Sequence, residues 1–400
     1  MSRSEDSGQI SSASEHYESA SCGLYDAAVC RSCSLLAVSG GSRIKTKELS
    51  ILRALKKFDL HPGKVDPIVI PSRVWGSRAK VKMSVAGTTE SPIIGIIRSD
   101  RSPVELAACP LSPAPFQSLL ETVRAHIHKA SLTPYNIEAR TGELKGLIIM
   151  GSSSLDEGAL RFVLRSTEAI PRIKKILPDL RVQHPWLKVV SCNIQPLPAA
   201  LLEGPEEIIL TEDTSIRSSY GAASLRFSPQ AFMQVTPEVA SALYSTAREW
   251  ASQGPCGDAL DLFCGVGGFS LSLAGLCCSV TGVEVSESAV LSARLSAQEQ
   301  GSATAMQFIA GDAEAVLQTL RERSFGLVVT NPPRRGLSAP LVSQIEAFRP
   351  HRIIYSSCNP DTFCRDVAMW RSSYSLTRVA PFDMFPLTEH CEVLGLLERK

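Results

Sequence analysis

The sequence predicts an α/β fold with a doubly wound, mainly parallel sheet in its C-terminal half and a sheet-rich α+β region before it. Between about residues 66 and 220, short β-like runs with turn signals recur, such as PIIGII, GLIIM, RFVLR and LKVVSCNIQ. From about residue 225, apolar runs alternate with helical stretches, as expected of βαβ units. The runs are DALDLFC (258–264), CSVTGVEV (278–285), MQFIAG (306–311), FGLVVTN (325–331) and RIIYSS (352–357).

A chain of 400 residues is long enough for two or three domains. The segment 1–21 is polar and lacks the apolar core of a secretory signal, so we expect a disordered tail. We expect residues 22–222 to form the α+β domain and residues 223–400 the parallel-sheet domain. A helix is predicted over 45–58, and it is a candidate to pack on the parallel-sheet domain. Its predicted apolar stripe consists of Leu49, Ile51, Leu52 and Leu55.

Composition and cysteine usage indicate a cytoplasmic protein. No apolar run reaches the roughly 18–20 residues that span a bilayer, and a net charge of +1 neither requires nor excludes nucleic acid. Twelve cysteines without an export signal indicate a reducing compartment, where metal ligation, catalysis and packing are commoner roles than disulfides. Five of them lie in or beside apolar runs, and we expect these in or near the core: Cys192, Cys256, Cys264, Cys277 and Cys278.

The first motif, DLFCGVGG (261–268), is a strand that runs into a glycine-rich turn and then a helix. Glycines let a ligand approach the backbone closely, although a simple tight turn would use them too. Glu284 ends the next strand roughly 20 residues later, where a carboxylate can accept the two hydroxyls of a ribose. The third spaced glycine of a dinucleotide-binding loop is absent. The pattern therefore favours a nucleoside without a pyrophosphate, such as S-adenosylmethionine.

Two further motifs end the fourth and fifth strands. In NPPRRGL (331–337), consecutive prolines cannot continue a ladder, so Asn331 is held at the strand tip. Arg334 and Arg335 either contact phosphate or face water. In IIYSSCNPDT (353–362), Cys358 ends the strand and Pro360 opens the next helix. Because a helix N-terminus lowers the pKa of a thiol, we expect Cys358 to be a nucleophile.

The last strand, HCEVLGLLER (390–399), carries Glu392 near its start. A lone glutamate in that position is more often a surface carboxylate than a functional one. Cys391 alternates to the opposite face, and Cys364 lies further into the preceding helix, so we expect both to pack in the core.

Near the N-terminus, Cys22, Cys30 and Cys33 are separated by seven and two residues, and Cys109 is a candidate fourth ligand. Thiolate clusters select zinc or iron–sulfur centres, and core packing is the alternative.

In WGSRAKVKM (75–83), Arg78, Lys80 and Lys82 share one face of a predicted strand. That face is either a solvated edge or a basic surface for an RNA backbone.

Taken together, these stretches resemble the family of RNA uracil-5-methyltransferases. The matching segments run in the family's order from about residue 22 to the C-terminus: CGLYDAAVCRSC, AACPL, FSPQAFMQV, DLFCGVGGF, NPPRRG, YSSCNPDT and DMFPLTEHCEVL. Within the family, the chain is most similar to the iron–sulfur enzymes that methylate uracil in 23S ribosomal RNA. The resemblance implies a Rossmann-like class I S-adenosylmethionine-dependent methyltransferase domain, preceded by an α+β domain with an iron–sulfur cluster.

The resemblance also implies roles for individual residues. The ligands of a [4Fe–4S] cluster would be Cys22, Cys30, Cys33 and Cys109. The contacts to S-adenosylmethionine would come from Gln234, Phe263, Glu284 and Asn331. Cys358 would be the nucleophile and Glu392 the base. The chain departs from many relatives at Thr236, where asparagine is frequent, and at Asn331, where aspartate is frequent.

The chemistry of the reaction accounts for these residue types. Uracil C5 is too weak a nucleophile to take a methyl group directly, whereas attack of a thiolate at C6 raises the electron density at C5. The C5 proton must then leave to a positioned base before the thiol is expelled. A cysteine, a carboxylate and a sulfonium site are the minimum set.

Three alternatives remain at this point. NPP-type strand tips also serve adenine N6 methylation, although such sites favour an aromatic where this chain has Arg334, and they need no nucleophilic cysteine. The same chemistry could act on another uridine of rRNA or tRNA. The chain could also be a non-catalytic iron–sulfur RNA-binding protein, against which the intact Cys358 and Glu392 weigh. The partner expected from the resemblance is 23S ribosomal RNA, and no obligate protein partner is inferred.

Overall fold

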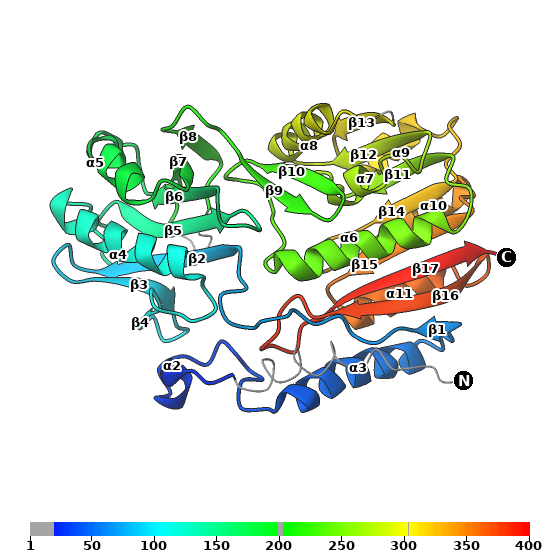
Figure 1. Cartoon of the computed structure of the whole chain (residues 1–400), viewed down its shortest axis with the longest axis horizontal. Coiled ribbons are helices and arrows are strands. Elements are labelled where there is room, and N and C mark those ends of the chain that lie inside the picture. Colours follow the sequence, from blue (N-terminus) through cyan, green and yellow to red (C-terminus); the bar gives the residue numbers. More distant parts are fainter. Residues whose placement is uncertain (1–19, 199–202, 303) are drawn as a thin grey trace, which may run out of the picture.

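The computed structural model describes residues 20–198, 203–302 and 304–400. The tail expected over 1–21 lies outside the described residues, apart from its last two positions. Two large sheets stand side by side, a seven-stranded one on the left of Figure 1 and an eight-stranded one on the right. Within the described ranges, no helix combines the length and the apolar character needed to cross a membrane.

The eight-stranded sheet has the strand order β1-β16-β17-β15-β14-β11-β12-β13. Five consecutive strands, which end at the edge strand β13, are mutually parallel and coincide with the five predicted runs: β11 (Asp258–Leu262), β12 (Ser279–Glu284), β13 (Ala305–Ala310), β14 (Leu327–Thr330) and β15 (Arg352–Ser357). The last strand, β17 (Glu392–Arg399), runs antiparallel between β15 and β16 (Tyr374–Phe382). The short β1 (Lys64–Val65) joins the edge beside β16. The predicted mainly parallel sheet is confirmed.

Helices cover both faces of this sheet, as a doubly wound fold requires. On one face the core includes α6 (Pro237–Ser252), α7 (Gly268–Ser272) and α8 (Glu287–Gln300). On the other it includes α9 (Ala313–Thr319), α10 (Ala339–Ala347) and α11 (Pro360–Met369). The N-terminal helix α3 (Gly40–Lys57) packs beside this second group.

Helix α3 begins five residues before the predicted start, and its buried face differs from the predicted stripe. Ile51 and Leu55 are buried, but Leu49 and Leu52 are 37% and 48% exposed. The buried positions follow the helical repeat from Lys47 through Ile51 to Leu55, and the two exposed leucines fall outside it. The prediction for Leu49 and Leu52 was therefore wrong.

A buried ion pair fixes α3 against the end of β16. The Lys47 ammonium contacts Asp383, and both side chains are fully buried. Lys47 also donates to the carbonyl of Phe385 at 2.9 Å. Because these charges are desolvated, removal of one partner would leave the other uncompensated.

The seven-stranded sheet has the order β4-β3-β2-β5-β6-β7-β8. Its strands are β2 (Lys80–Gly87), β3 (Pro92–Ile97), β4 (Pro103–Glu105), β5 (Leu144–Gly151), β6 (Gly158–Leu164), β7 (Leu187–Ile194) and β8 (Glu206–Ile209). All neighbours are antiparallel except β6 and β7, which α5 (Ile170–Gln183) connects. Helices α4 (Ala114–Lys129) and α5 pack on one face.

Short backbone contacts join the two sheets. A hairpin of β9 (Ile216–Tyr220) and β10 (Ala223–Phe227) packs in the core of the eight-stranded sheet. The amide of Ala79, just before β2, donates to Val235 before α6 at 2.8 Å, and the Ala79 carbonyl accepts from Gly151. The N-terminal α2 (Gly23–Asp26) lies below the seven-stranded sheet in Figure 1.

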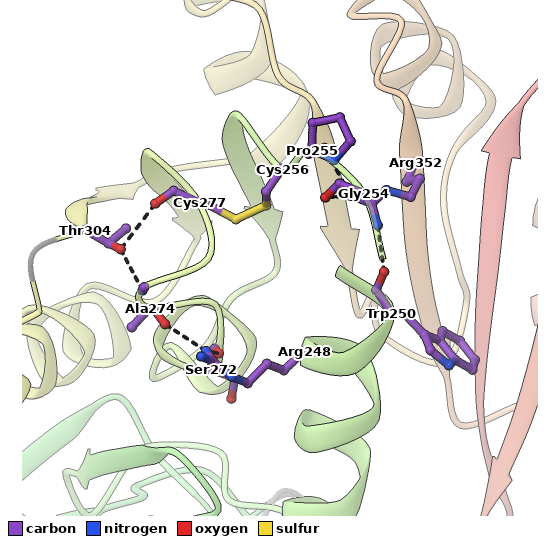
Figure 2. The surroundings of a disulfide bond; sticks show 11 residues. Arg248, Trp250, Gly254, Pro255, Cys256, Ser272, Ala274, Cys277, Thr304 and Arg352 are labelled. Carbon is purple, nitrogen blue, oxygen red and sulfur yellow. Dashed lines mark hydrogen bonds between the residues drawn. A yellow bond between two sulfur atoms is a disulfide. The ribbon is translucent and has the colours of Figure 1, made fainter. Parts of the chain in front are cut away.

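Cys256 and Cys277 form a disulfide, which the sequence analysis did not predict. Both are buried, as expected, but they precede the adjacent parallel strands β11 and β12, so their Cα atoms lie 5.0 Å apart, within bonding range. Figure 2 shows the bond among backbone carbonyls held by Arg248, Arg352 and Thr304. The bond sits where β11 and β12 begin, away from their carboxyl ends.

Candidate active site

The register of the eight-stranded sheet brings the predicted catalytic residues together. Ser357 at the end of β15 pairs with Val393 near the start of the antiparallel β17. Cys358 follows the first strand and Glu392 opens the second, so both lie at the same edge. In Figure 1, β17 begins on the side nearest the seven-stranded sheet. The candidate active site therefore lies where the two sheets face one another.

Cys358 is half-buried, and its pKa is raised rather than lowered. Burial is the main cause, and the charge of Glu392 adds to it. The prediction that the helix N-terminus lowers this pKa was wrong, because burial and the charge of Glu392 outweigh the groups that lower it. The side chain of Asn359 caps α11 and accepts from the amides of Asp361 and Thr362 at 3.0 and 3.3 Å.

Glu392 is buried, with 3% of its surface exposed, in contrast to the surface carboxylate that its position alone suggested. The hydroxyl of Ser356 donates to its Oε1 at 2.5 Å. Burial raises the pKa of Glu392 to about 7, and the Ser356 hydrogen bond opposes that rise. A carboxyl group with a pKa near neutrality can take up and release a proton at physiological pH.

Arg334 is a site residue that the sequence analysis left undecided between phosphate and water. Its guanidinium acts on the Cys358 thiol and lowers the pKa of that thiol. The same guanidinium lies 3.0 Å from Nε2 of His390, whose ring packs edge-on against Phe385. The hydroxyl of Thr362 donates to the Arg334 carbonyl at 3.2 Å. Arg334 thus acts on the expected nucleophile. The sequence signal that could have identified this role is its position directly after the paired prolines at the end of β14.

The glycine-rich turn lies at the carboxyl end of β11. Phe263 has a positive φ of 58°, which reverses the chain directly after the strand. Glu284 accepts from the amide of Gly265 at 3.2 Å and from that of Ser286 at 2.9 Å. A Cβ at Gly265 would meet nothing within 4 Å, whereas one at Gly268 would approach the Tyr244 ring to 2.5 Å. Gly265 thus keeps open space beside Glu284, and Gly268 is needed for packing.

Beneath this turn, Asp261 is a buried acid that the sequence analysis did not single out. The amide and hydroxyl of Ser270 donate to its Oδ2 at 2.9 and 2.6 Å. Its Oδ1 is buried and accepts no hydrogen bond from the described residues. The buried hydroxyl of Thr330, at the end of β14 and on the opposite face of the sheet, also has no partner among them. Burial raises the pKa of Asp261 to about 7. Buried polar atoms without partners beside an open turn fit a polar ligand such as S-adenosylmethionine.

The two other predicted cofactor contacts flank the same edge. The amide of Asn331 donates to the Leu262 carbonyl at 3.3 Å, which places Asn331 beside the turn that follows β11. Gln234 is buried in the segment before α6, and the hydroxyl of Thr236 donates to the Met384 carbonyl at 2.9 Å. Thr236 therefore joins this segment to the loop between β16 and β17.

The four N-terminal cysteines are free, half-buried thiols. The pKa of Cys33 is raised to about 11, mainly by burial, with further contributions from Cys109, Cys30 and Cys22. Cys109 likewise has a raised pKa that Cys22 and Cys30 influence. The four thiols thus lie within electrostatic reach of one another, and four cysteines are the ligand type that a [4Fe–4S] cluster takes, although the thiols are not arranged around a metal position. Across the described ranges, no group of three or more His, Cys, Asp or Glu has the arrangement of a metal site.

The stretch from Cys22 to Cys33, called the cysteine segment below, also contacts the loop that leads to Glu392. Cys22, Cys33 and Cys109 pack around a small apolar cluster that contains Leu387 of that loop. The Leu35 amide donates to the Leu387 carbonyl at 3.0 Å. The cysteine segment therefore packs below the sheet edge that carries Cys358 and Glu392, here called the catalytic edge, in the view of Figure 1.

The basic face predicted for WGSRAKVKM is largely engaged within the protein. Lys80 donates to the Ala231 carbonyl at 2.8 Å, and burial lowers its pKa to about 8. Lys82 forms an ion pair with Glu203, and its side chain remains 49% exposed. Of the remaining cysteines, Cys192, Cys264, Cys364 and Cys391 are buried as expected, whereas Cys278 is exposed. The prediction of a near-core position for Cys278 was wrong, because it begins the exposed entry to β12.

Comparisons with known proteins agree with this geometry. The sequence model of a family described as tRNA (Uracil-5-)-methyltransferase matches residues 213–400. A Cronobacter sakazakii protein named 23S rRNA (uracil(747)-C(5))-methyltransferase RlmC is 41% identical over 389 residues, which are 95% of this chain and 100% of the relative. The Escherichia coli O1:K1 / APEC protein of the same name is 40% identical over 379 residues, with coverages of 95% and 100%.

A solved structure shares the fold. It is that of the Pyrococcus abyssi tRNA (uracil-54, C5)-methyltransferase in complex with S-adenosyl-L-homocysteine, with a TM-score of 0.75 and 24% identity. The match covers 91% of this chain and 85% of that one. The similarity thus extends over both sheets.

Proposed function

The chain belongs to the RNA uracil-5-methyltransferase family, and we infer from this premise that it transfers a methyl group from S-adenosylmethionine to C5 of a uridine in 23S ribosomal RNA. We propose the position that its relatives' names carry, uracil 747. The observation that supports this activity most directly is the meeting of Cys358 and Glu392 at one sheet edge, with Arg334 on the thiol.

The side chains at that edge account for the steps that the protein itself performs. The Cys358 thiolate attacks C6 of uracil and forms a C–S bond, while the π electrons move through C5 toward the O4 carbonyl. Arg334 stabilises the thiolate before the attack. Bound S-adenosylmethionine would supply an electrophilic methyl group for C5. Glu392 then removes the C5 proton, the C5–C6 double bond re-forms, and the C–S bond breaks to release Cys358.

Ser356 and the surrounding core hold Glu392 ready for this task. The Ser356 hydroxyl fixes one carboxylate oxygen, and burial sets the pKa of Glu392 near neutrality. A base with an ordinary carboxyl pKa would be a weaker proton acceptor. The burial of Glu392 thus lowers the stability of the fold and, by raising the pKa, makes the carboxylate a stronger base.

We propose that S-adenosylmethionine binds along the carboxyl ends of β11, β12 and β14. Its contacts would come from Gln234, Phe263, Glu284 and Asn331. Glu284 would accept from the ribose hydroxyls, because its carboxylate lies beside the open space at Gly265. Asp261, with its free Oδ1, is a further polar group at this edge.

We also propose a [4Fe–4S] cluster on Cys22, Cys30, Cys33 and Cys109, with a structural role. The packing of Cys22, Cys33 and Cys109 against one small apolar cluster supports it, with Cys30 within electrostatic reach of Cys33. The methylation needs no electron transfer, so the cluster would act by holding the cysteine segment against the loop around Leu387. It would thereby support both the catalytic edge and the seven-stranded sheet.

The domain division follows the same premise. We propose a tail over 1–21, an iron–sulfur and RNA-recognition domain over 22–222 and a methyltransferase domain over 223–400, in a cytoplasmic enzyme. Helix α3 and strand β1 belong by sequence to the first domain but pack on the eight-stranded sheet of the second.

The experiment that tests the proposed function is the mapping of 5-methyluridine in 23S rRNA from a strain that lacks this gene. The modification at position 747 should disappear and return with the wild-type gene, but not with a Cys358→Ala version. Loss of a different 5-methyluridine would identify that nucleotide as the target in place of position 747. An unchanged modification map would contradict the proposed activity.

A further inference from the structure

A hollow of about 680 Å³ opens on the face of the seven-stranded sheet that lies opposite α4 and α5. Because side chains alternate along a strand, one set of β2 residues packs toward α4, and the other set lines the hollow. Ser84 and Ala86 of β2 give part of it a floor of small side chains. A flat ring can lie on such a floor.

The hollow is strongly basic. Lys82, Arg98, Arg101 and Lys145 line it, against a single carboxylate, that of Glu138. Glu138 lies 3.3 Å from Arg101, but these side chains are 69% and 70% exposed, so the pair is weak. Lys82 is paired with Glu203, which lies outside the lining, so an excess of two positive charges is left. The ligand that complements it is a polyanion.

Apolar and aromatic groups lie among these cations. Tyr135 forms part of the wall, and the Lys145 ammonium stands 4.5 Å from the centroid of its ring. Ile97 and Ile137, also in the lining, are 44% and 46% exposed. This combination of groups suits single-stranded nucleic acid, because its bases stack on apolar or aromatic surfaces while its phosphates pair with arginine and lysine.

The basic surface continues toward the cysteine segment. Arg98 lies between the large hollow and a second one of about 420 Å³, which Cys30 and Arg31 line. The Arg98 guanidinium donates to the carbonyl of Val29. The cysteine segment therefore helps to position a cation of the large hollow.

We propose that this hollow binds a single-stranded segment of the RNA substrate, separate from the uridine that Cys358 attacks. The proposal rests on the proposed function, since it names a second binding surface for the same RNA. Bases lie on the small-residue floor and beside Tyr135, and phosphates meet Arg101 and Lys145. An acidic protein would use the same cations but would leave the flat floor without a role.

The test is RNA binding by an Arg101→Ala/Lys145→Ala variant, measured by fluorescence anisotropy with a labelled 23S rRNA fragment that spans uracil 747. The matched control is Arg321→Ala/Lys64→Ala, which removes the same charge from side chains that are 80% and 62% exposed. We expect the Kd of the first variant to rise on the order of tenfold. Its salt dependence should become shallower by about 0.7 for each RNA phosphate that the variant no longer neutralises. The steady-state effect should fall on KM, and the control should match the wild type.

Equal Kd values and salt slopes in the two variants would overturn the proposal. So would weakened binding of polyglutamate by the first variant with unchanged RNA affinity, which would identify an acidic protein as the ligand. Photo-crosslinking with 4-thiouridine-substituted RNA separates this proposal from the proposed function. A crosslink in the peptide that contains Tyr135, absent from Tyr135→Ala, would support the hollow even if the wild-type enzyme methylated a different RNA.

Discussion

The carboxyl edge of the eight-stranded sheet and the open face of the seven-stranded sheet carry their polar groups in opposite surroundings. At the first, Glu392 and Asp261 are buried, and burial moves the pKa of each to about 7. At the second, Arg101 and Glu138 are mostly in water. Desolvation makes a side chain reactive at a cost in stability, whereas a solvated cation can attract a phosphate without that cost. We therefore propose that the eight-stranded sheet carries the chemistry and the seven-stranded sheet contributes to RNA binding.

The largest effect should come from the nucleophile. Cys358→Ala should lower methyl transfer by on the order of 10³-fold or more, because the other free cysteines near this edge in the described part of the chain, Cys264 and Cys391, are buried. Cofactor affinity, measured by calorimetry, should stay near that of the wild type. Turnover that persists in purified Cys358→Ala would remove this residue from its role.

The cysteine segment tests whether the two regions depend on one another. Cys109→Ser should lose the iron–sulfur absorbance altogether after anaerobic purification, and RNA affinity should fall with it, because the segment holds Arg98. Cys278→Ser, at an exposed thiol outside the segment, is the matched control. A colourless wild-type protein with tightly bound zinc would contradict the cluster while leaving the methyltransferase untouched.

The cost of burial at the catalytic edge can be measured directly. The pKa of Glu392 is raised from its ordinary 4.5 to about 7, so its contribution to stability is complete below about pH 4.5 and is lost as the pH rises through 7. At pH 8, Glu392→Gln should therefore be more stable than the wild type by about 3 kcal/mol, at 1.36 kcal/mol for each pKa unit. The gain should vanish below pH 5.

Urea denaturation at pH 5 and pH 8 measures this difference. Glu322→Gln, at a side chain that is 89% exposed, is the control and should change nothing at either pH. A Glu392→Gln variant that is no more stable than the wild type at pH 8 would mean that the carboxylate is solvated.

Substitution of Arg334 should lower the rate by less, because it changes only the fraction of Cys358 that is ionised. Arg334→Met removes a cation that lowers the pKa of Cys358, so that pKa should rise further. Each added pKa unit should lower the rate about tenfold at a pH below the pKa. The part of the pH–rate profile in which the rate rises as Cys358 loses its proton should move to higher pH. The pH dependence of alkylation of the Cys358 peptide by iodoacetamide should move in the same direction. Arg335→Met is the neighbouring control, and equal profiles for the two variants would contradict the role.

Much of the catalytic sheet could be predicted from the sequence, because its strands are continuous apolar runs that end in glycine, proline or asparagine. Other elements could not. β16 contains Arg378 and Pro381 within its nine residues, which weakens a strand pattern. β1 is two residues long and exists only through its pairing with β16. Such elements depend on tertiary contacts that a local pattern does not carry.

The site was predictable in its residue types and less so in its electrostatics. Cys358 and Glu392 follow from the motifs, but the raised pKa of Cys358 depends on burial and on the charge of Glu392, which only the fold brings near. The importance of Arg334 depends on contacts with residues from two other elements. The Cys256–Cys277 disulfide depends on two strands that become neighbours only in the fold.

The most direct test of the central claim is the fate of RNA on Glu392→Gln. Without the base, attack by Cys358 and methylation of C5 should proceed, but the C5 proton should remain and the C–S bond should not break. A covalent protein–RNA complex should accumulate on denaturing gels in the presence of S-adenosylmethionine. Mass spectrometry should place a methylated uridine on the peptide that contains Cys358. Normal product yield with no adduct, or an adduct on another cysteine, would contradict the account.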